Sequence, residues 1–411
     1  EYLYPKIGLL LHYDVYLVKS FMTYSRHLTN TIKHHLATRK EAIVLTGPRQ
    51  VGKTYLLNQL FPQAIYFTMD DQQMRSLFDS YSLVAYRQIM PDQGIIILDE
   101  VQNLSDPGRA GKLIYDNFPN IHLIITGSAG LTIKNKHTES MAGRATSLEL
   151  LPLTLSELLT QLEAPGETLN WRIWDHLTGG GNVPTVPIHT YDPAQMWERV
   201  LLYGLYPALV NHVDPRQYLL DLIERTIFRD LLDLSLISDK KIALNLLTLL
   251  AHQIGGLVSY EELATRLQID ARTVKHYLNV FEESYLIYRL YPYSLRQRNE
   301  LTKRPKIYFY DTGIRNALIQ SFSPLTLRDD VGQLFENFVV MEAVKAQNYH
   351  APQAKLNYWR TKAGSEIDLV IQLENELIGV ECKWHQGRLN TAFKVRYPQA
   401  IVKTVTRDNL I

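Results

Sequence analysis

The fold is decided by one stretch of the chain, Gly47-Pro48-Arg49-Gln50-Val51-Gly52-Lys53-Thr54, which matches the pattern GxxxxGK[ST]. An apolar run over 42–46 precedes it and a helical pattern over 52–60 follows it, so a strand leads through a glycine-rich loop into a helix. The glycines let backbone N–H groups close around phosphate oxygens at the positive end of the helix dipole. We therefore expect a phosphate-binding loop, in which Lys53 reaches the outer phosphates and the Thr54 hydroxyl binds Mg²⁺.

A second buried strand supplies acidic groups for the same site. Residues 94–100 read GIIILDE, and a run of consecutive apolar residues is typical of a central parallel strand. Two carboxylates follow at its carboxyl end, where ligands of such sheets bind. Asp99 is expected to hold Mg²⁺, directly or through water, and Glu100 to orient and polarise the attacking water. The alternative is a pair of solvated acids in a turn.

Two further segments carry polar residues that are candidates to act on the phosphates. The run IHLIIT ends at Thr126 and is followed by Gly127 and Ser128. Thr126 and Ser128 are candidates to contact the γ-phosphate or the water and so to distinguish the bound nucleotides, with a plain turn as the alternative. Arg144, in the segment MAGR, is a candidate to stabilise charge on the transferred phosphoryl group, in cis or across a subunit boundary. A structural salt bridge of Arg144 agrees equally well with the sequence.

The composition excludes several classes of protein. Hydrophobic residues make up 46% of the 411 residues and charged residues 21%, the balance of a folded protein of about two or three domains. The formal net charge is +1, so any surface for nucleic acid must be local, and no membrane partner is expected. Cys382 is the only cysteine, which excludes a disulfide framework and a cysteine-based zinc finger. No run approaches the roughly 18 apolar residues of a membrane-spanning helix, so we expect a soluble, cytoplasmic protein.

The strand-like runs of the N-terminal part alternate with segments that are long enough for helices. The runs cover 42–46, 64–68, 94–98, 122–126 and 146–150. This alternation predicts a parallel sheet that is covered by helices on both faces. The helical patterns that follow are interrupted by a Gly- and Pro-rich loop over 178–193.

A helix-turn-helix pattern lies further along the chain. Ser259 and Glu262 form a capping box that opens a helix over 260–267, and Asp270 caps a second helix over 271–283. The second helix is in the recognition position, and its basic residues off the apolar face are Arg272, Lys275 and His276. The hairpin that follows is rich in Lys and Arg, which suits a phosphate backbone, and its candidate contacts are Arg296, Arg298, Lys303 and Arg304. A winged helix that serves as a lid or as a protein docking surface is the alternative.

The last part of the chain brings acids and a lysine onto neighbouring strands. Strand patterns cover 355–360, 365–372 and 377–384, after a helix over 331–347 that carries Glu336. Glu381 and Lys383 share one strand face, and so do Glu366 and Asp368. Such charges are costly to bring together unless they bind a cation and an anion, and Mg²⁺ with a phosphodiester would satisfy both. Solvated charges on an edge strand are the alternative.

The first set of motifs resembles a known family. GPRQVGKT, IIILDE, ITGS, AGR and LPLTLSEL are similar to the prokaryotic AAA+ ATPases that carry a C-terminal domain of unknown function, and GLYPALV at 204–210 and PKIYFYDTG at 305–313 agree. The resemblance covers the chain from about Met22 to its end. It implies ATP and Mg²⁺ as ligands, a sheet order of 5-1-4-3-2 and a helical lid at about 196–253.

The C-terminal pattern has a resemblance of its own. Asp368 with Glu381-x-Lys383 resembles the restriction-endonuclease-like, PD-(D/E)xK, nuclease fold, with Ile367 in place of the proline. The resemblance implies that Asp368 and Glu381 bind metal and that Lys383 positions the attacking water or stabilises charge. It also implies that Glu336 is an accessory metal ligand, and that one or two metal ions activate the water.

Together these features predict an α/β protein with an AAA+ P-loop ATPase core, a helical lid, a winged-helix domain and a C-terminal nuclease-like α/β domain. The expected boundaries are 1–21 for an N-terminal extension, 22–158 for the core, 159–254 for insertion loop and lid, 255–324 for the winged helix and 325–411 for the nuclease-like domain. The predicted function is ATP hydrolysis coupled to DNA binding and DNA cleavage, in a homo-oligomer if Arg144 acts across subunits. The alternative is a nucleotide-controlled switch that binds protein partners and has an inactive C-terminal fold.

Overall fold

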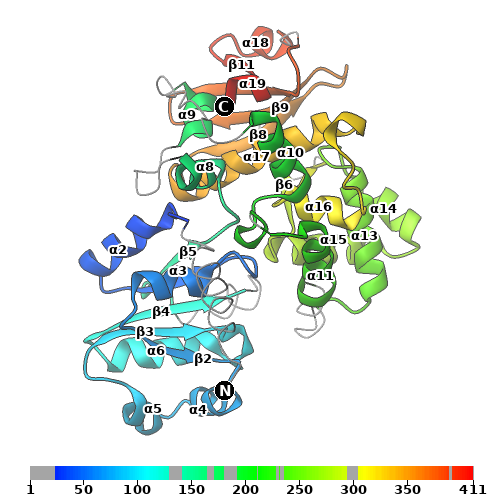
Figure 1. Ribbon diagram of the computed structural model, residues 1–411. Helices are drawn as coiled ribbons and strands as arrows, with labels where there is room; N and C mark the ends of the chain where they lie inside the picture. Colours follow the sequence, from blue (N-terminus) through cyan, green and yellow to red (C-terminus); the bar gives the residue numbers. More distant parts are fainter. Residues whose placement is uncertain are drawn as a thin grey trace, which may run out of the picture.

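The computed structural model describes residues 24–128, 141–163, 171–179, 192–210, 212–227, 231, 236–293, 304–387 and 391–410 (Figure 1). These ranges contain a five-stranded sheet, a four-stranded sheet and a two-stranded hairpin. The expected extension over 1–21 and three predicted DNA contacts, Arg296, Arg298 and Lys303, lie outside the described residues. Within the described part of the chain, no helix is long and apolar enough to cross a membrane.

The first sheet is parallel throughout and carries the phosphate-binding loop. Its strands are β1 (Ala42–Thr46), β2 (Ile65–Thr68), β3 (Gly94–Asp99), β4 (Ile121–Gly127) and β5 (Ala145–Glu149). They lie in the order β2-β3-β4-β1-β5, which confirms the order that the resemblance implies. Each strand end lies within one residue of its predicted position, because the buried apolar runs mark the strands clearly.

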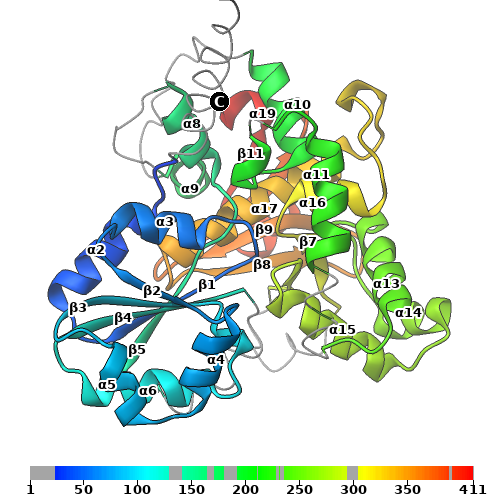
Figure 2. The same cartoon turned by 60° about the horizontal axis from the view of Figure 1, so that its bottom comes forward.

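Helices cover both faces of this sheet, as the alternating pattern predicts (Figure 2). The helices α2 (Leu28–Thr38) and α3 (Lys53–Leu60) lie on one face, and α4 (Gln72–Asp79), α5 (Leu83–Ile89) and α6 (Pro107–Asn117) lie on the other. Alternate side chains of β1 point to opposite faces of the sheet. Ile43 and Leu45 pack in the core under α2 and α3, and Val44 packs in the core under α4, α5 and α6. All five residues of β1 are buried, so the loop after it starts from a fixed position.

The helices after the sheet are divided between two hydrophobic cores. The helices α8 (Leu155–Glu163), α9 (Arg172–Thr178) and α10 (Pro193–Tyr203) pack with the C-terminal part of the chain. The 3₁₀ turn η2 (Pro207–Leu209), α11 (Pro215–Asp221), the π-helical turn η3 (Leu222–Ile227) and α13 (Lys240–His252) contribute to the core shared with α2 and α3. The described helices of the segment 196–253 therefore join two different cores, and the helical lid expected there stays a prediction.

The predicted pair of helices and the hairpin follow in the chain. The helices α14 (Tyr260–Leu267) and α15 (Ala271–Glu283) begin and end at their predicted residues. The Ser259 side chain accepts a hydrogen bond from the backbone N–H of Glu262, so the predicted helix cap is confirmed. The chain continues through the antiparallel pair β6 (Ile287–Leu290) and β7 (Lys306–Phe309) to α16 (Thr312–Leu318).

The C-terminal part combines one long helix with the second sheet. After the 3₁₀ turn η5 (Leu325–Leu327) come α17 (Val331–Tyr349), β8 (Lys355–Arg360), β9 (Glu366–Gln372), β10 (Leu377–Lys383), α18 (Ala392–Arg396), β11 (Ile401–Thr406) and α19 (Arg407–Leu410). The strand order is β11-β10-β9-β8, with β8, β9 and β10 antiparallel and β11 parallel to β10. The helix α17 lies along this sheet (Figure 1) and is buried over most of its length.

Candidate functional site

The phosphate-binding loop begins where β1 leaves the sheet. Gly47 has a φ of 144°, and a Cβ at this position would lie 2.0 Å from the carbonyl oxygen of Leu150, so no other residue fits. Gly52 has a φ of 89°, in the left-handed region, and directly precedes α3. These two glycines let the backbone wrap around the N-terminus of α3, as the motif predicts.

Lys53 lies inside this loop. Its residue is only 6% exposed, and its Nζ donates hydrogen bonds to the carbonyl oxygens of Gly47 and Pro48, both at 2.9 Å. A phosphate would offer this ammonium charged oxygens, which accept stronger hydrogen bonds than neutral carbonyls do. The lysine is thus held at the place where a phosphate would enter.

Thr54 and Asp99 meet beside the loop. The Thr54 hydroxyl donates to Asp99 Oδ2 at 3.0 Å, and the Thr126 hydroxyl donates to the other oxygen, Oδ1. Asp99 ends β3 and is buried. A hydroxyl and a carboxylate oxygen are ligands that Mg²⁺ takes at nucleotide sites, so these residues fit the ion that the motif implies.

The Glu100 side chain is held in place by Gln102 and Ser128. Its φ of 55° is in the left-handed region, which few residues other than glycine adopt. Gln102 Nε2 donates to Glu100 Oε2 and, at 3.1 Å, to Ser128 Oγ, which in turn donates to Glu100 Oε2 at 3.4 Å. The predicted residues Glu100 and Ser128 are therefore in contact. The sequence analysis missed Gln102, whose only signal is its position two residues after Glu100.

Arg144 lies away from this site in its own chain. Its carbonyl oxygen accepts from the backbone N–H of Ala42, the first residue of β1, whereas the phosphate loop follows the last residue. At about 3.3 Å per residue, β1 separates the two by roughly 16 Å. The Arg144 side chain pairs instead with Asp116, at 2.9 Å from Nε to Oδ1. In this arrangement the Arg144 side chain lies away from its own phosphate site, and a role across a subunit boundary stays a prediction.

Arg26 supports the loop from outside, and the sequence analysis missed it. Its guanidinium donates to the carbonyl oxygens of Val51 at 2.8 Å and Leu151 at 2.5 Å, and pairs with Glu157 at 3.2 Å. Burial alone would raise the pKa of Glu157, but Arg26, His27 and two backbone N–H donors lower it overall. A buried ion pair therefore fixes the loop to the segment that follows β5.

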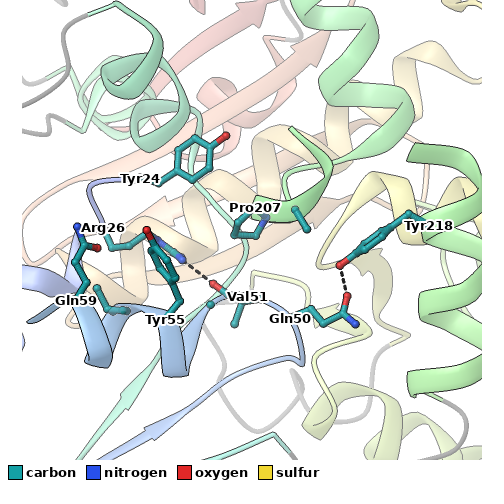
Figure 3. A pocket seen from close by; sticks show the side chains of 11 residues that line it. Tyr24, Arg26, Gln50, Val51, Tyr55, Gln59, Pro207 and Tyr218 are labelled. Atoms are coloured by element: carbon teal, nitrogen blue, oxygen red, sulfur yellow. Dashed lines mark hydrogen bonds between the residues drawn. The ribbon is translucent and has the colours of Figure 1, made fainter. Parts of the chain in front are cut away.

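Two cavities meet at the loop. One, of about 320 Å³, is lined by Arg49, Gln50, Gly52, Lys53, Thr54, Tyr55 and Glu100. The other, of about 270 Å³, lies behind the loop and is shown in Figure 3. Its wall includes Tyr24 before α2, Tyr55 on α3, Pro207 on η2 and Tyr218 on α11. Because the second cavity has mostly apolar walls, it suits a flat ring, whereas the first suits charged groups.

Two tyrosines connect this site to the helices beyond the sheet. The Tyr285 hydroxyl lies 3.0 Å from Thr46 Oγ1, at the end of β1, and donates to Glu149 Oε1 at 3.1 Å. Tyr218 on α11 donates to Gln50 Oε1 of the loop. Neither tyrosine could be predicted from the sequence, since each contact joins residues that are far apart in the chain.

The predicted DNA-contacting residues of α15 lie on its surface. Arg272, Lys275 and His276 are all exposed, and Arg304, just before the hairpin strand β7, is exposed as well. His276 Nε2 also lies 3.0 Å from the carbonyl oxygen of Leu236. The exposed side of α15 is therefore basic, as the sequence predicts.

Two basic residues of the hairpin do not belong to that surface. Arg289 pairs with Glu282 through both Nε and Nη2 and is mostly buried. Lys306 is only 2% exposed and points into the C-terminal part of the chain. Their charges are neutralised inside the protein, so the basic character of the hairpin is weaker than its sequence suggests.

The acids of the C-terminal pattern surround this lysine. Lys306 Nζ lies 3.0 Å from Glu336 Oε1 and 3.9 Å from Asp368 Oδ1, and it pairs with Glu366 Oε1. Burial and Asp368 raise the pKa of Glu336 to about 7, although Lys306 opposes this shift. Burial also raises the pKa of Asp368, again against Lys306.

The remaining members of the predicted metal site lie on β10. Glu381 is buried, Lys383 is partly exposed, and Asp368 Oδ2 accepts from the backbone N–H of Cys382 at 2.9 Å. Within the described ranges, no group of three or more acids, histidines or cysteines is arranged to hold a metal ion. The Lys306 ammonium lies beside Glu336 and Asp368, and the metal roles expected of Glu336, Asp368 and Glu381 stay predictions.

Comparison with protein families gives three matches along the chain. Residues 39–159 match the family described as AAA domain. Residues 194–325 and 331–398 match two domains of unknown function, DUF8612 and DUF4143. The first match covers the parallel sheet, the phosphate-binding loop and the acids at the end of β3.

Related chains are known from bacteria and archaea. The uncharacterized protein Rv2008c of Mycobacterium tuberculosis is 27% identical over 351 residues, which cover 84% of this chain and 70% of that protein. The uncharacterized protein MJ1637 of Methanocaldococcus jannaschii is 27% identical over 360 residues, with 81% and 73% covered.

Among solved structures, the Walker-type ATPase PABY2304 of Pyrococcus abyssi is 16% identical to this chain. The match covers 72% of this chain and 96% of that one, with a TM-score of 0.45, which is too low to extend the likeness to the whole fold. The family match and the geometry of the loop agree: residues 39–159 resemble an AAA domain and carry a phosphate-binding P-loop.

Proposed function

We propose that this chain binds ATP with Mg²⁺ and hydrolyses it. The observation that carries the proposal is the contact between Thr54 and Asp99, at 3.0 Å, beside the loop that holds Lys53. These groups suit a Mg²⁺ ion and the phosphates that it accompanies, and they lie at the carboxyl edge of a parallel sheet. The ion, when bound, offsets charge on the phosphates.

Each residue of the site has a task in this proposal. Lys53 exchanges its two carbonyl partners for phosphate oxygens. Glu100 accepts a hydrogen bond from the attacking water and orients it, and Gln102 with Ser128 keeps the Glu100 carboxylate in place. The adenine ring enters the apolar cavity between Tyr24, Tyr55 and Pro207, which adjoins the loop.

Phosphate release from ATP with Mg²⁺ tests this proposal. Lys53→Ala should weaken nucleotide binding at least about tenfold, and Glu100→Gln should bind ATP but turn over at least about a hundredfold more slowly. Matched controls are Lys33→Ala on the exposed side of α2 and Glu41→Gln before β1, which should both keep the wild-type rate. A wild-type rate in Glu100→Gln would remove Glu100 from its task, and no hydrolysis by the wild-type chain would refute the proposal.

DNA binding through α15 is a second proposal, which the exposed basic side of this helix supports. The helices α13, α14 and α15 followed by a hairpin have the element order expected of a winged helix. Replacing Arg272 and Lys275 by Ala should weaken DNA binding equally for unrelated sequences and reduce the salt dependence by about two counterions. Lys112→Ala on α6 is the control. If DNA affinity and its salt dependence did not change, the basic side of α15 would not be the DNA-binding surface.

For the C-terminal domain we favour the catalytically inactive alternative in the arrangement described. Lys306 stands among the acids that the nuclease resemblance assigns to metal, which supports a scaffold that binds a protein partner rather than a metal-dependent nuclease. The tasks of Asp368, Glu381 and Lys383 in DNA cleavage stay predictions. Mg²⁺- or Mn²⁺-dependent cleavage of plasmid DNA by the wild-type chain, lost in Asp368→Ala, would favour the nuclease instead.

A further inference from the structure

The two cavities at the phosphate loop share part of their walls. Gln50, Gly52 and Tyr55 line both the charged cavity of about 320 Å³ and the mostly apolar cavity of about 270 Å³. In a nucleotide, the sugar joins the phosphates to the ring. With the phosphates in the first cavity and the ring in the second, the sugar therefore lies at the junction between them, next to these shared residues. This step rests on nucleotide binding as proposed.

Gln50 has an unusual backbone conformation for a residue with a side chain. Its φ of 62° is in the left-handed region, which glycine adopts far more easily. Strained backbone of this kind persists where the surrounding structure holds it, and it is common at ligand sites. A glutamine at this position places an amide group at the junction, where a glycine would place none.

Tyr218 reaches the same junction from α11, as Figure 3 shows. Its hydroxyl donates to Gln50 Oε1, and the next residue of the helix, Leu219, is fully buried in the core that α11 shares with α2 and α3. Burial raises the pKa of Tyr218, so the hydroxyl keeps its proton at neutral pH. After this bond is made, the phenol oxygen can still accept a hydrogen bond and the Gln50 amide nitrogen can still donate one.

An acceptor and a donor side by side match two neighbouring hydroxyl groups. Each hydroxyl of a ribose both donates and accepts, so one can donate to the Tyr218 oxygen while the other accepts from Gln50 Nε2. Gln59 on α3 provides a contrast, because it lines the apolar cavity but is not among the described residues that line the charged one. Its amide is therefore away from the junction.

We propose that Tyr218 and Gln50 form a sugar-binding pair that selects ribonucleotides by their two neighbouring hydroxyls. The pair brings one group from the phosphate loop and one from α11, so both parts of the chain take part in recognising the sugar. Gln50 is exposed, and water competes for its hydrogen bonds. Two such bonds should favour a ribonucleotide roughly fivefold to thirtyfold over one that lacks both hydroxyls.

Calorimetric titration of the full chain with ADP and with 2′,3′-dideoxy-ADP, both with Mg²⁺, tests the proposal. The wild type should bind ADP more tightly by that factor. Tyr218→Phe removes the phenol oxygen, and Gln50→Gly removes the amide while it keeps a residue that adopts the same φ without strain. Each change should weaken ADP binding and leave dideoxy-ADP binding nearly unaltered, so the ratio of the two affinities falls towards one.

Gln59→Ala is the matched control, because it removes the same amide from the apolar cavity and should keep the wild-type ratio. The ratio also separates sugar recognition from a general disturbance of the loop, which would weaken both nucleotides alike. Equal affinities of the wild type for ADP and dideoxy-ADP, or a wild-type ratio in both Tyr218→Phe and Gln50→Gly, would overturn the proposal while nucleotide binding itself stands. Binding of neither nucleotide by the wild type would refute the proposed function and this inference with it.

Discussion

At the scale of the residue, His27 illustrates how packing fixes the charge of a side chain. Its ring stacks on Trp171, with ring centroids 3.6 Å apart, and its backbone N–H donates to Glu157. Burial lowers the pKa of His27 from 6.5 to about 4; Glu157 opposes this shift, and Arg26 adds to it. His27 is therefore neutral in the folded chain at neutral pH, next to the ion pair that supports the phosphate loop.

Because of this lowered pKa, the free energy of unfolding decreases as the pH falls. Between pH 6.5 and 4 the unfolded chain binds a proton at His27 that the folded chain does not bind, so acid favours unfolding. The contribution is fully present above pH 6.5 and is lost as the pH falls to about 4, by an amount on the order of 3 kcal/mol. Urea unfolding of the wild type and of His27→Gln over this range measures it.

The substitution should reduce the loss of stability in acid, even if it also weakens the stacking on Trp171 and lowers stability at every pH. His34→Gln, at an exposed position of α2, is the control and should keep the wild-type pH dependence. An identical pH dependence in wild type and His27→Gln would contradict the argument.

The predictability of the site also differs from residue to residue. Lys53, Thr54, Asp99 and Glu100 could be predicted because each belongs to a short motif with a known neighbour in the chain. Arg26 could not, since its partners Val51 and Leu151 lie 25 and 125 residues away and no local pattern marks them. The buried position of Lys306 could not be predicted for the same reason: its acids come from α17 and β9, which only the fold brings near.

At the scale of the element, sequence patterns predicted helices and strands better than their packing. The helices α14 and α15 match their predicted bounds because their caps, Ser259 and Asp270, use local hydrogen bonds. That α10 packs with α17 while α13 packs with α14 and α16 could not be read in the same way. Both are amphipathic helices. Their periodicity shows that one face of each is buried, but it does not show which element packs against that face.

The contact between α15 and β1 provides a test at this scale. Tyr285 follows α15, is 3% exposed, and joins Thr46 of β1 to Glu149 of β5 through its hydroxyl. Tyr285→Phe should lower the free energy of unfolding by about 1–3 kcal/mol, because it leaves the buried Thr46 hydroxyl and the partly buried Glu149 carboxylate without this partner.

The midpoint of urea unfolding measures the effect. Tyr115→Phe on α6 is a suitable control, since this half-buried tyrosine makes no side-chain hydrogen bond within the described residues. Equal midpoints for wild type and Tyr285→Phe would mean that the hydroxyl contributes nothing to the joint between α15 and the sheet.

At the scale of the whole molecule, one connector links the ATPase domain to the C-terminal helix. The segment after β5 contacts α17 where the Tyr349 hydroxyl accepts from Leu151 N at 2.7 Å and where Leu155 N donates to Glu342 at 3.0 Å. Arg26 fixes the same segment to the phosphate loop. The phosphate loop and the C-terminal helix are therefore joined through the same short segment of the chain.

The position of Arg144 bears on how whole chains assemble. It lies at the edge of the sheet opposite its own phosphate loop, about one-third exposed, and its pair with Asp116 is of the surface kind that contributes only about 0–1 kcal/mol. An arginine finger must reach the phosphates, so Arg144 can act only on the site of a neighbouring chain. A homo-oligomer with this edge facing the phosphate loop of the next subunit is the prediction that follows.

Mixing two inactive proteins tests this prediction. Arg144→Ala alone should reduce ATP hydrolysis at least about tenfold, because each site loses the charge that its neighbour supplies. Lys53→Ala chains keep Arg144, so adding them to Arg144→Ala chains should restore activity at the mixed contacts. Asp116→Ala removes the same surface ion pair and should keep the wild-type rate, which separates a catalytic loss from a structural one. Full activity in Arg144→Ala, or no recovery at any mixing ratio, would exclude the role across subunits and leave Arg144 as a partner of Asp116 only.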